Sequence, residues 1–146
     1  MRKWIAAVAT VAAIAGTAGC NGGGGAKEPK DEALACAKAV KDSSGLGGNL
    51  STAITVARNN AGMQPLSLQH DQAMADAQQY AKDLLASLKE LQSRDISPEL
   101  RKTLAESQTT VEQIQTTLGD ATAKPPDATG KLAVIDDEIN RVCKGK

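Results

Sequence analysis

The chain has 146 residues with 17 basic and 17 acidic side chains, so its formal net charge is zero. It contains no basic block, and Trp4 and Tyr80 are its only aromatic residues. A protein that reads duplex nucleic acid needs a Lys/Arg-rich face, and one that binds single strands needs aromatic side chains on which bases stack. We therefore expect no nucleic-acid binding and no carbohydrate recognition that relies on stacking.

Residues 1–19 have the organisation of a secretion signal. Arg2 and Lys3 form a basic start, an apolar run extends from Ile5 to Ala15, and small residues follow up to Cys20. As a helix the apolar run would span about 17 Å, well short of the ~30 Å hydrocarbon core of a bilayer. The run is thus too short for a permanent membrane span.

The segment Thr17-Ala18-Gly19-Cys20 resembles the lipobox of a bacterial lipoprotein precursor. Ala18, Gly19 and Cys20 match the usual pattern, and Thr17 stands where Leu is usual. The resemblance implies cleavage between Gly19 and Cys20 and a diacylglyceryl thioether on Cys20. Two or more acyl chains give stable anchoring to a membrane. The resemblance therefore implies a protein anchored on the extracytoplasmic side of a membrane of the cell envelope. The alternative is ordinary secretion after cleavage at Ala15, which would leave Cys20 as a free or cross-linking thiol.

Residues 20–30 contain four consecutive glycines and no apolar side chain larger than that of Ala26, Cys20 aside. Such a segment cannot bury a core, so we expect a tether that extends to at most about 35 Å. Residues 31–146 are enough for one domain with one core. Without residues 1–19 the chain carries a formal charge of minus two, with 15 basic and 17 acidic side chains.

Cys36 and Cys143 lie near the two ends of this domain. In an exported protein such a pair predicts a disulfide. A metal site is the alternative, but no third or fourth soft ligand lies near either cysteine in the sequence.

The pattern of apolar residues predicts an all-α domain of four or five helices, because no run alternates with the period of a strand. We expect the first helix over Pro29–Asp42, with Ala33, Cys36, Ala37 and Val40 inward. Ser43 to Gly48 predict a flexible break. A short helix is expected after it, with Leu50, Ala53, Ile54 and Ala57 on its apolar face.

Three more helices are expected, over about Ser67–Ser93, Pro98–Leu118 and Ala128–Cys143. Ser97-Pro98-Glu99 is a strong helix start, with Ser as N-cap and Pro at the first helical position. If the first and last helices are neighbours, Cys143 meets Cys36. The domain is then a disulfide-closed bundle of mostly antiparallel helices.

His70 and Met74 are four residues apart and share a helical face, so together they are a candidate pair of ligands for haem or copper. The alternative is a histidine that caps a neighbouring helix or stays in solvent. A second candidate is an uncharged surface for protein contact, since Gln108-Thr109-Thr110 recurs as Gln115-Thr116-Thr117. The stretch Asp136-Asp137-Glu138, with Asp127 and Asp120, is a weak candidate for a calcium site, because consecutive acids on a helix point in different directions whereas calcium needs converging oxygens.

The sequence shows no Ser/His/Asp order, no Gly-rich phosphate loop and no reactive thiol, so we expect neither an enzyme nor a bound cofactor. We expect a membrane-anchored extracytoplasmic lipoprotein whose bundle binds another protein, as an adaptor, regulator or exclusion factor. The alternative is a carrier or sensor of a small ligand, haem or a metal ion, with its site in the bundle near His70, Met74 and Tyr80.

Overall fold

A computed structural model describes residues 29–62, 68–120 and 123–146 of the chain. Within these ranges it contains four helices and no strand: α1 (Glu32–Asn60), α2 (Leu68–Gln92), α3 (Pro98–Gly119) and α4 (Thr129–Cys143). The all-α prediction of four or five helices is confirmed, and the described residues form four. The predicted signal peptide, Cys20 and most of the predicted tether lie outside the described residues. None of the four helices is both long and apolar enough to cross a membrane.

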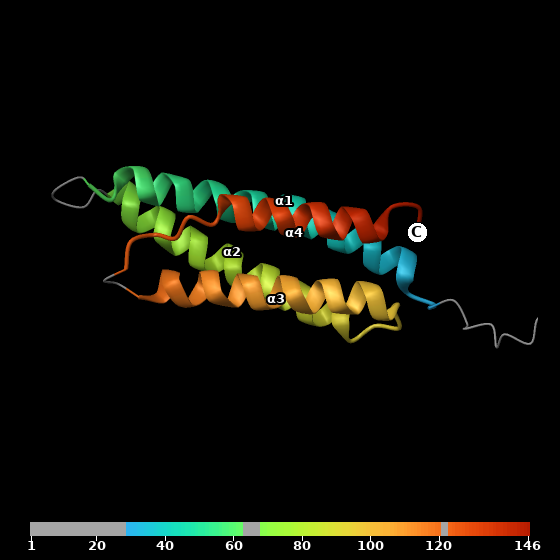
Figure 1. The fold of residues 1–146 in the computed structure, drawn as a ribbon. Helices are drawn as coiled ribbons and strands as arrows, with labels where there is room; N and C mark the ends of the chain where they lie inside the picture. Colours follow the sequence, from blue (N-terminus) through green and yellow to red (C-terminus); the bar gives the residue numbers. More distant parts are fainter. Residues whose placement is uncertain (1–28, 63–67, 121–122) are drawn as a thin grey trace, which may run out of the picture.

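The helices form an antiparallel bundle in which each one packs against two neighbours. The described residues place α1 against α2, α2 against α3, α3 against α4 and α4 against α1, and the backbones of diagonally opposite helices do not approach closely. Figure 1 shows that the start of α1, the α2–α3 connection and the C-terminus share one end of the bundle. This end is hereafter called the Pro29 end, after the first described residue. The other end, where α1 and α3 finish, is hereafter the Gly62 end. The 29 residues of α1 give the bundle a length of about 43 Å.

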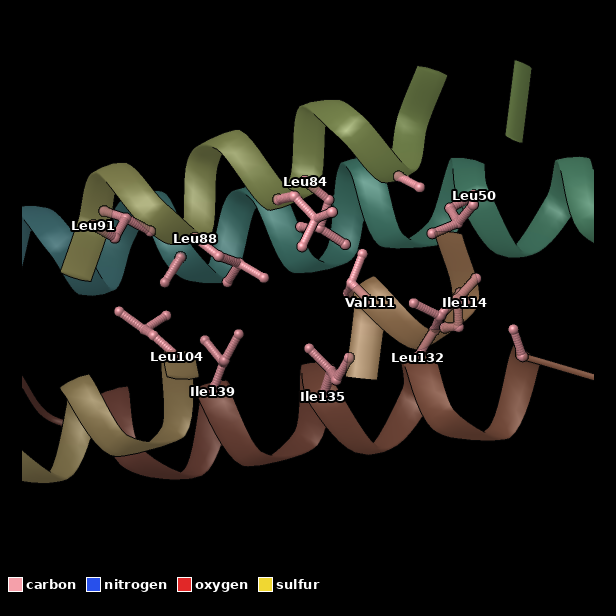
Figure 2. Packing of buried hydrophobic residues seen from close by; sticks show 14 of the residues in the cluster. Leu50, Leu84, Leu88, Leu91, Leu104, Val111, Ile114, Leu132, Ile135 and Ile139 are labelled. Atoms are coloured by element: carbon pink, nitrogen blue, oxygen red, sulfur yellow. The ribbon is translucent and has the colours of Figure 1, made fainter. Parts of the chain in front are cut away.

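The core is aliphatic and runs along the bundle axis. Figure 2 shows side chains of all four helices meeting there, among them Leu84 from α2 and Ile135 from α4. Tyr80, the one aromatic residue in the part of the chain described, is half-buried at the edge of this core. Small alanines complete the α1–α2 contact, since Ala57, Ala77 and Ala81 are fully buried.

The predicted break between two N-terminal helices is wrong, because α1 continues through Ser43 to Gly48 without interruption. Serine and glycine lower the intrinsic helix propensity, but packing of a helix against its neighbours routinely overrides it. Ser43 and Gly47 are buried, and the Ser43 hydroxyl donates to Asp136 Oδ1 of α4 at 2.6 Å. Small residues here leave room for α4 beside α1.

The predicted inward face of the first helix is also wrong in part. Ala33 and Ala37 are exposed, whereas Cys36 is buried as predicted. The buried positions instead lie on the same face of α1 as Leu50 and Ile54. They extend this face toward the start of the helix, at spacings of mostly three and four residues. They are Glu32, Ala35, Cys36, Ala39, Ser43 and Gly47. Because α1 is one continuous helix, the residues of this single buried face must point to the core along the whole length of α1.

Alanine at two exposed glycines of α1 is expected to stabilise the protein. A Cβ built on Gly45 or Gly48 meets no atom within 4 Å. Glycine is less favourable than alanine by about 0.5–1 kcal/mol in a helix interior, so Gly45→Ala/Gly48→Ala should raise the free energy of unfolding by about 1–2 kcal/mol in urea titrations. Gly145→Ala is the control without gain, because Gly145 has φ 84°. No gain in the double variant would contradict a continuous helix.

The boundaries of α2, α3 and α4 lie within one residue of those predicted, whereas α1 begins at Glu32, three residues after the predicted start at Pro29. The start of α3 is capped as predicted. The Ser97 hydroxyl accepts a hydrogen bond from Leu100 N at 3.2 Å, and Pro98 occupies the first turn.

The predicted disulfide is confirmed. Cys36 of α1 and Cys143 of α4 are bonded, with their Cα atoms 5.3 Å apart, at the Pro29 end. The bond therefore joins the first and last helices of the bundle.

Candidate functional site

A groove between the outer faces of α1 and α2 is a candidate site in the described part of the chain. It has a volume of about 820 Å³ and is open to solvent. Volumes of about 300–1,000 Å³ are typical of sites that hold small ligands, and an open groove of this size also fits side chains of a protein partner. Ten residues line it: Asn49, Thr52, Ala53 and Val56 from α1, and Leu68, Gln69, Gln72, Ala73, Asp76 and Tyr80 from α2.

The groove has an apolar floor and a mixed rim. Ala53 and Ala73 are buried, and their small side chains let the surface sink between the two helices. Leu68 is 88% exposed and Val56 38% exposed, which makes them two of the four large hydrophobic residues that the described surface leaves open. A leucine in solvent at the edge of a groove is a typical contact point for a partner.

The polar groups of the groove are mostly amides. The Gln72 amide donates to Asp76 Oδ1 at 2.8 Å, one turn along α2. Asp76 is the one ionisable acid or base among the lining residues other than the tyrosine, so the groove is mildly acidic. Amides and one carboxylate can bind a peptide backbone or an amine, but they do not form a catalytic set.

The structure does not bring His70, Met74 and Tyr80 together in this groove. Tyr80 lines the groove, whereas neither His70 nor Met74 is among its lining residues. Met74 instead packs partly buried against the core. The groove therefore contains Tyr80 but not the other two residues, and a ligand site formed by all three stays a prediction.

His70 acts on the end of α1. Its Nδ1 lies 2.9 Å from the carbonyl oxygen of Ala57, so the ring donates a hydrogen bond in the tautomer with a proton on Nδ1. Ala57 belongs to the last turn of α1, where carbonyl groups lack partners within the helix. This contact fits the alternative expected from the sequence, a histidine that caps a neighbouring helix.

Metal-ligand clusters are not found in the described ranges, 29–62, 68–120 and 123–146. No three His, Cys, Asp or Glu side chains come together there. The acids near the end of the chain serve other contacts: Asp136 accepts from Ser43, Glu138 pairs with Arg141 at 2.9 Å, and Asp127 pairs with Arg58 at 2.9 Å.

The threonines of the Thr/Gln surface on α3 use their hydroxyl groups within their own helix. Thr109, Thr110, Thr116 and Thr117 each donate to the carbonyl oxygen four residues earlier, at 2.9–3.2 Å. Their hydroxyl hydrogens are thus engaged, so the surface offers a partner mainly methyl groups and amides.

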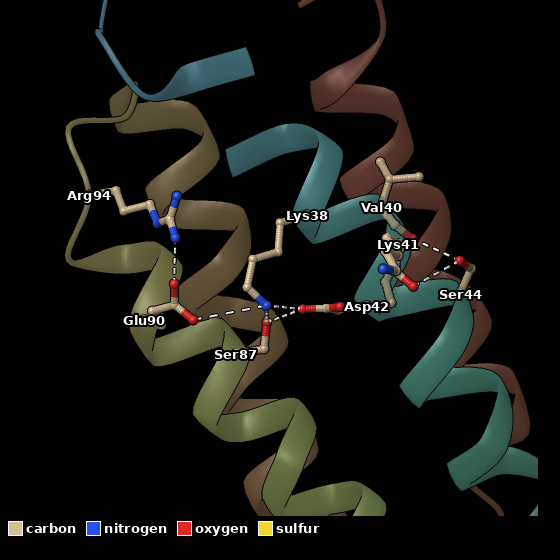
Figure 3. Close-up of polar contacts among 9 residues, drawn as sticks. Lys38, Val40, Lys41, Asp42, Ser44, Ser87, Glu90 and Arg94 are labelled. Atoms are coloured by element: carbon tan, nitrogen blue, oxygen red, sulfur yellow. Dashed lines mark hydrogen bonds and ion pairs between the residues drawn. The ribbon is translucent and has the colours of Figure 1, made fainter. Parts of the chain in front are cut away.

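A polar cluster between α1 and α2 has no counterpart among the sequence predictions. Figure 3 shows Lys38 of α1 directed at Asp42 on its own helix and at Ser87 and Glu90 on α2. Lys38 Nζ lies 2.5 Å from Asp42 Oδ2 and 3.1 Å from Ser87 Oγ, and Ser87 in turn donates to Asp42. Arg94 extends the cluster, because its Nη2 lies 2.5 Å from Glu90 Oε1.

Serine, lysine and aspartate together resemble a catalytic set, but this cluster is not arranged as one. Ser87 is only 6% exposed, so no substrate reaches its hydroxyl. The Lys38 ammonium is paired with the carboxylate of Asp42 and lies within 4 Å of that of Glu90. The cluster connects α1 to α2 and supplies hydrogen-bond partners for the buried Ser87 hydroxyl.

Two carboxylates of the bundle have lowered pKa values. Burial raises the pKa of Asp42, but hydrogen bonds from Lys38 and Ser87 and the charges of Lys38 and Lys41 outweigh it, so the pKa lies below its ordinary value. Burial likewise raises the pKa of Glu32, and hydrogen bonds from the Ser97 hydroxyl and amide, with the Lys146 ammonium, bring it below the ordinary value.

Glu32 is the more buried of the two and joins three parts of the chain at the Pro29 end. It is 6% exposed, and it accepts from Ser97 N at 2.7 Å and from Ser97 Oγ at 2.6 Å. Lys146 Nζ lies 3.5 Å away. The start of α1, the α2–α3 connection and the C-terminal segment are thereby connected.

The two lowered pKa values predict loss of stability in acid. A carboxyl group with a lower pKa in the folded state stabilises the fold above its unfolded pKa, near 4, and loses that contribution as the pH falls through the folded pKa. Glu32→Gln should reduce the free energy of unfolding by about 1–3 kcal/mol at pH 7 and by clearly less at pH 3. Urea titrations at both pH values measure this. Exposed Asp137→Asn is the control, and an equal loss for Glu32→Gln at both pH values would contradict the assignment.

Comparison with known proteins gives no relatives for this chain: no protein-family model, no curated protein and no solved structure matches it.

Proposed function

We propose that this chain is a lipid-anchored protein of the cell envelope, on the extracytoplasmic side of its membrane, whose four-helix bundle binds another protein without catalysing a reaction. Cys20 carries the lipid in this proposal, residues 20–30 are the tether and residues 31–146 are the binding domain. The lipobox resemblance of Thr17-Ala18-Gly19-Cys20 and the preceding apolar run support the anchor.

The use of the three cysteines is the observation that carries the proposal. Cys36 and Cys143 form a disulfide, a bond typical of proteins outside the cytoplasm. Cys20 is the one cysteine of the given chain outside this disulfide, so it has no cysteine partner within the chain. A free thiol in an oxidising compartment is reactive, whereas lipidation consumes it.

The α1–α2 groove is the proposed contact site for the protein partner. It combines an exposed leucine, a partly exposed valine and an apolar floor in one surface. The α3 surface, by contrast, has no large hydrophobic residue among those that the described surface exposes. A groove with a leucine at its rim supplies the buried apolar contact on which most protein interfaces depend.

Photo-cross-linking in living cells tests the groove. A photoreactive amino acid at Gln69, on the groove wall, should give a discrete adduct of reproducible mass. Leu68→Asp should abolish that adduct, because a carboxylate would be desolvated in the contact. Leu34→Asp is the matched control, since Leu34 is 67% exposed on α1 near the Pro29 end, and it should leave the adduct unchanged.

Two results would contradict the groove as the contact site. One is the absence of any adduct from Gln69 when a photoreactive group at Thr116 on α3 gives one. The other is an adduct from Gln69 that survives Leu68→Asp.

A carrier of a small ligand remains the second candidate function, and the volume of the groove with Tyr80 on its wall favours it. An aromatic ring beside an apolar floor offers a stacking surface for a flat or amphipathic molecule. Native mass spectrometry of the protein purified from its own host distinguishes the two functions. A carrier shows an additional bound mass that Tyr80→Ala removes, whereas a protein-binding bundle shows the mass of the chain alone.

A further inference from the structure

The two ends of the bundle differ in charge. The Pro29 end, taken as residues 29–34, 94–102 and 141–146, carries seven basic and four acidic side chains. The Gly62 end, taken as residues 57–62, 68–76, 112–120 and 123–131, carries three basic and five acidic side chains. The bundle is therefore positive at the end from which residues 20–30 would lead to a membrane, and negative at the other.

The cations of the Pro29 end lie on the surface. Lys30, Arg101, Lys102, Arg141, Lys144 and Lys146 are exposed, and they come from the start of α1, from α3 and from the end of the chain. Figure 1 shows these three segments at the same end of the bundle. A cluster that surrounds one end in this way can meet a flat surface with several charges at once.

The acids of the same end are engaged in contacts with other segments of the protein. Glu32 is buried and bonded to Ser97, as described above. The Asp31 carboxylate accepts from Asp95 N at 3.2 Å, and that of Asp95 accepts from Lys30 N at 3.4 Å. Glu99 lies 3.6 Å from Arg141. Lys30, Arg101 and Lys144, by contrast, form no ion pair in the described part of the chain.

We infer that the Pro29 end docks on an anionic lipid bilayer, so that the bundle stands upright with the Gly62 end away from the membrane. The inference rests on the proposed lipid anchor, because a tether of at most about 35 Å holds this end at the bilayer surface. Basic side chains near an anionic surface each add attraction within about 10 Å. The α1–α2 groove, which starts at Asn49 about 25 Å along α1, then faces a partner rather than lipid.

Vesicle sedimentation without the lipid anchor tests this docking. The described core lies between Ala35 and Val142, so the chain from residue 20 onward with Cys20→Ser contains the whole folded unit. It should sediment with vesicles of phosphatidylcholine containing 40% phosphatidylglycerol at low salt, and not with vesicles of phosphatidylcholine alone. Raising the salt to about 0.5 M should release it, because the Debye length falls to a few ångströms.

Two triple variants with the same change in net charge locate the contact. Lys30→Glu/Arg101→Glu/Lys144→Glu changes the Pro29 end and should lower the vesicle-bound to free ratio by about tenfold or more. Lys82→Glu/Lys124→Glu/Lys131→Glu changes exposed lysines away from that end and should leave the ratio within about twofold of the parent. Circular dichroism melting confirms that both variants are folded.

Equal loss of binding in the two triple variants would overturn the inference, since net charge alone would then explain it. Failure of the parent chain to sediment with the anionic vesicles would also overturn it. Neither result bears on lipidation, because the tested chain lacks Cys20. Absence of lipid on Cys20 in the native protein, by contrast, would refute the anchor while leaving the vesicle result as it stands.

Discussion

Reduction of the Cys36–Cys143 disulfide is expected to lower the free energy of unfolding by about 4–5 kcal/mol, which corresponds to a fall in Tm of roughly 15–20 °C. The bond joins residues 107 positions apart, so it closes nearly the whole folded domain into one loop. Closing so long a loop removes a large part of the conformational entropy of the unfolded chain. For a domain whose total stability is about 5–15 kcal/mol, this is a large share.

Thermal melts with and without a reducing agent measure the effect, and Cys36→Ala/Cys143→Ala gives the matched variant. The double variant should melt at the temperature of the reduced protein and should not respond to the reducing agent. Equal Tm values for the oxidised and reduced protein would contradict a disulfide between the ends of the domain.

Leu84→Ala is the second change with a large expected effect. Leu84 is 1% exposed and lies in the middle of the core, where side chains of several helices meet (Figure 2). Removing a buried leucine side chain loses apolar burial and leaves a cavity, which together cost about 3 kcal/mol. Urea unfolding should therefore show a lower midpoint with an unchanged slope.

Leu34→Ala is the control of the same chemistry at an exposed position. Leu34 is 67% exposed, so the same truncation should change the free energy of unfolding by less than about 0.5 kcal/mol. Similar losses for the two variants would show that Leu84 does not lie in the core, and that would contradict the packing of α2 described above.

Sequence periodicity predicts most of this fold because each of the last three helices carries a regular apolar stripe between strong boundary residues. Ser97 and Pro98 set the start of α3, and the observed start agrees. The exception is α1, where Ser43 to Gly48 have low helix propensity but are held helical by packing against α4. That packing is a long-range contact, which no local pattern reveals.

The candidate site is less predictable than the fold. Tyr80 was predicted near a ligand site and does line the groove, but its companions on the groove wall are mostly alanines, amides and Thr52. Such residues carry no local signature, and they line a groove only because the fold places α1 and α2 side by side, with the small Ala53 and Ala73 buried between them. The Lys38 cluster with Asp42 and Ser87 depends in the same way on contacts between residues more than forty positions apart.

The proposed lipid anchor depends on the fate of the three cysteines, and the intact mass of the protein extracted from its native membrane tests this directly. We expect a chain that begins at Cys20, carries the added mass of a diacylglyceryl group on that residue, and is two hydrogens lighter than its reduced form because Cys36 and Cys143 are bonded. A chain of different N-terminus with no lipid mass, or one with Cys20 in a disulfide, would contradict the proposed anchor.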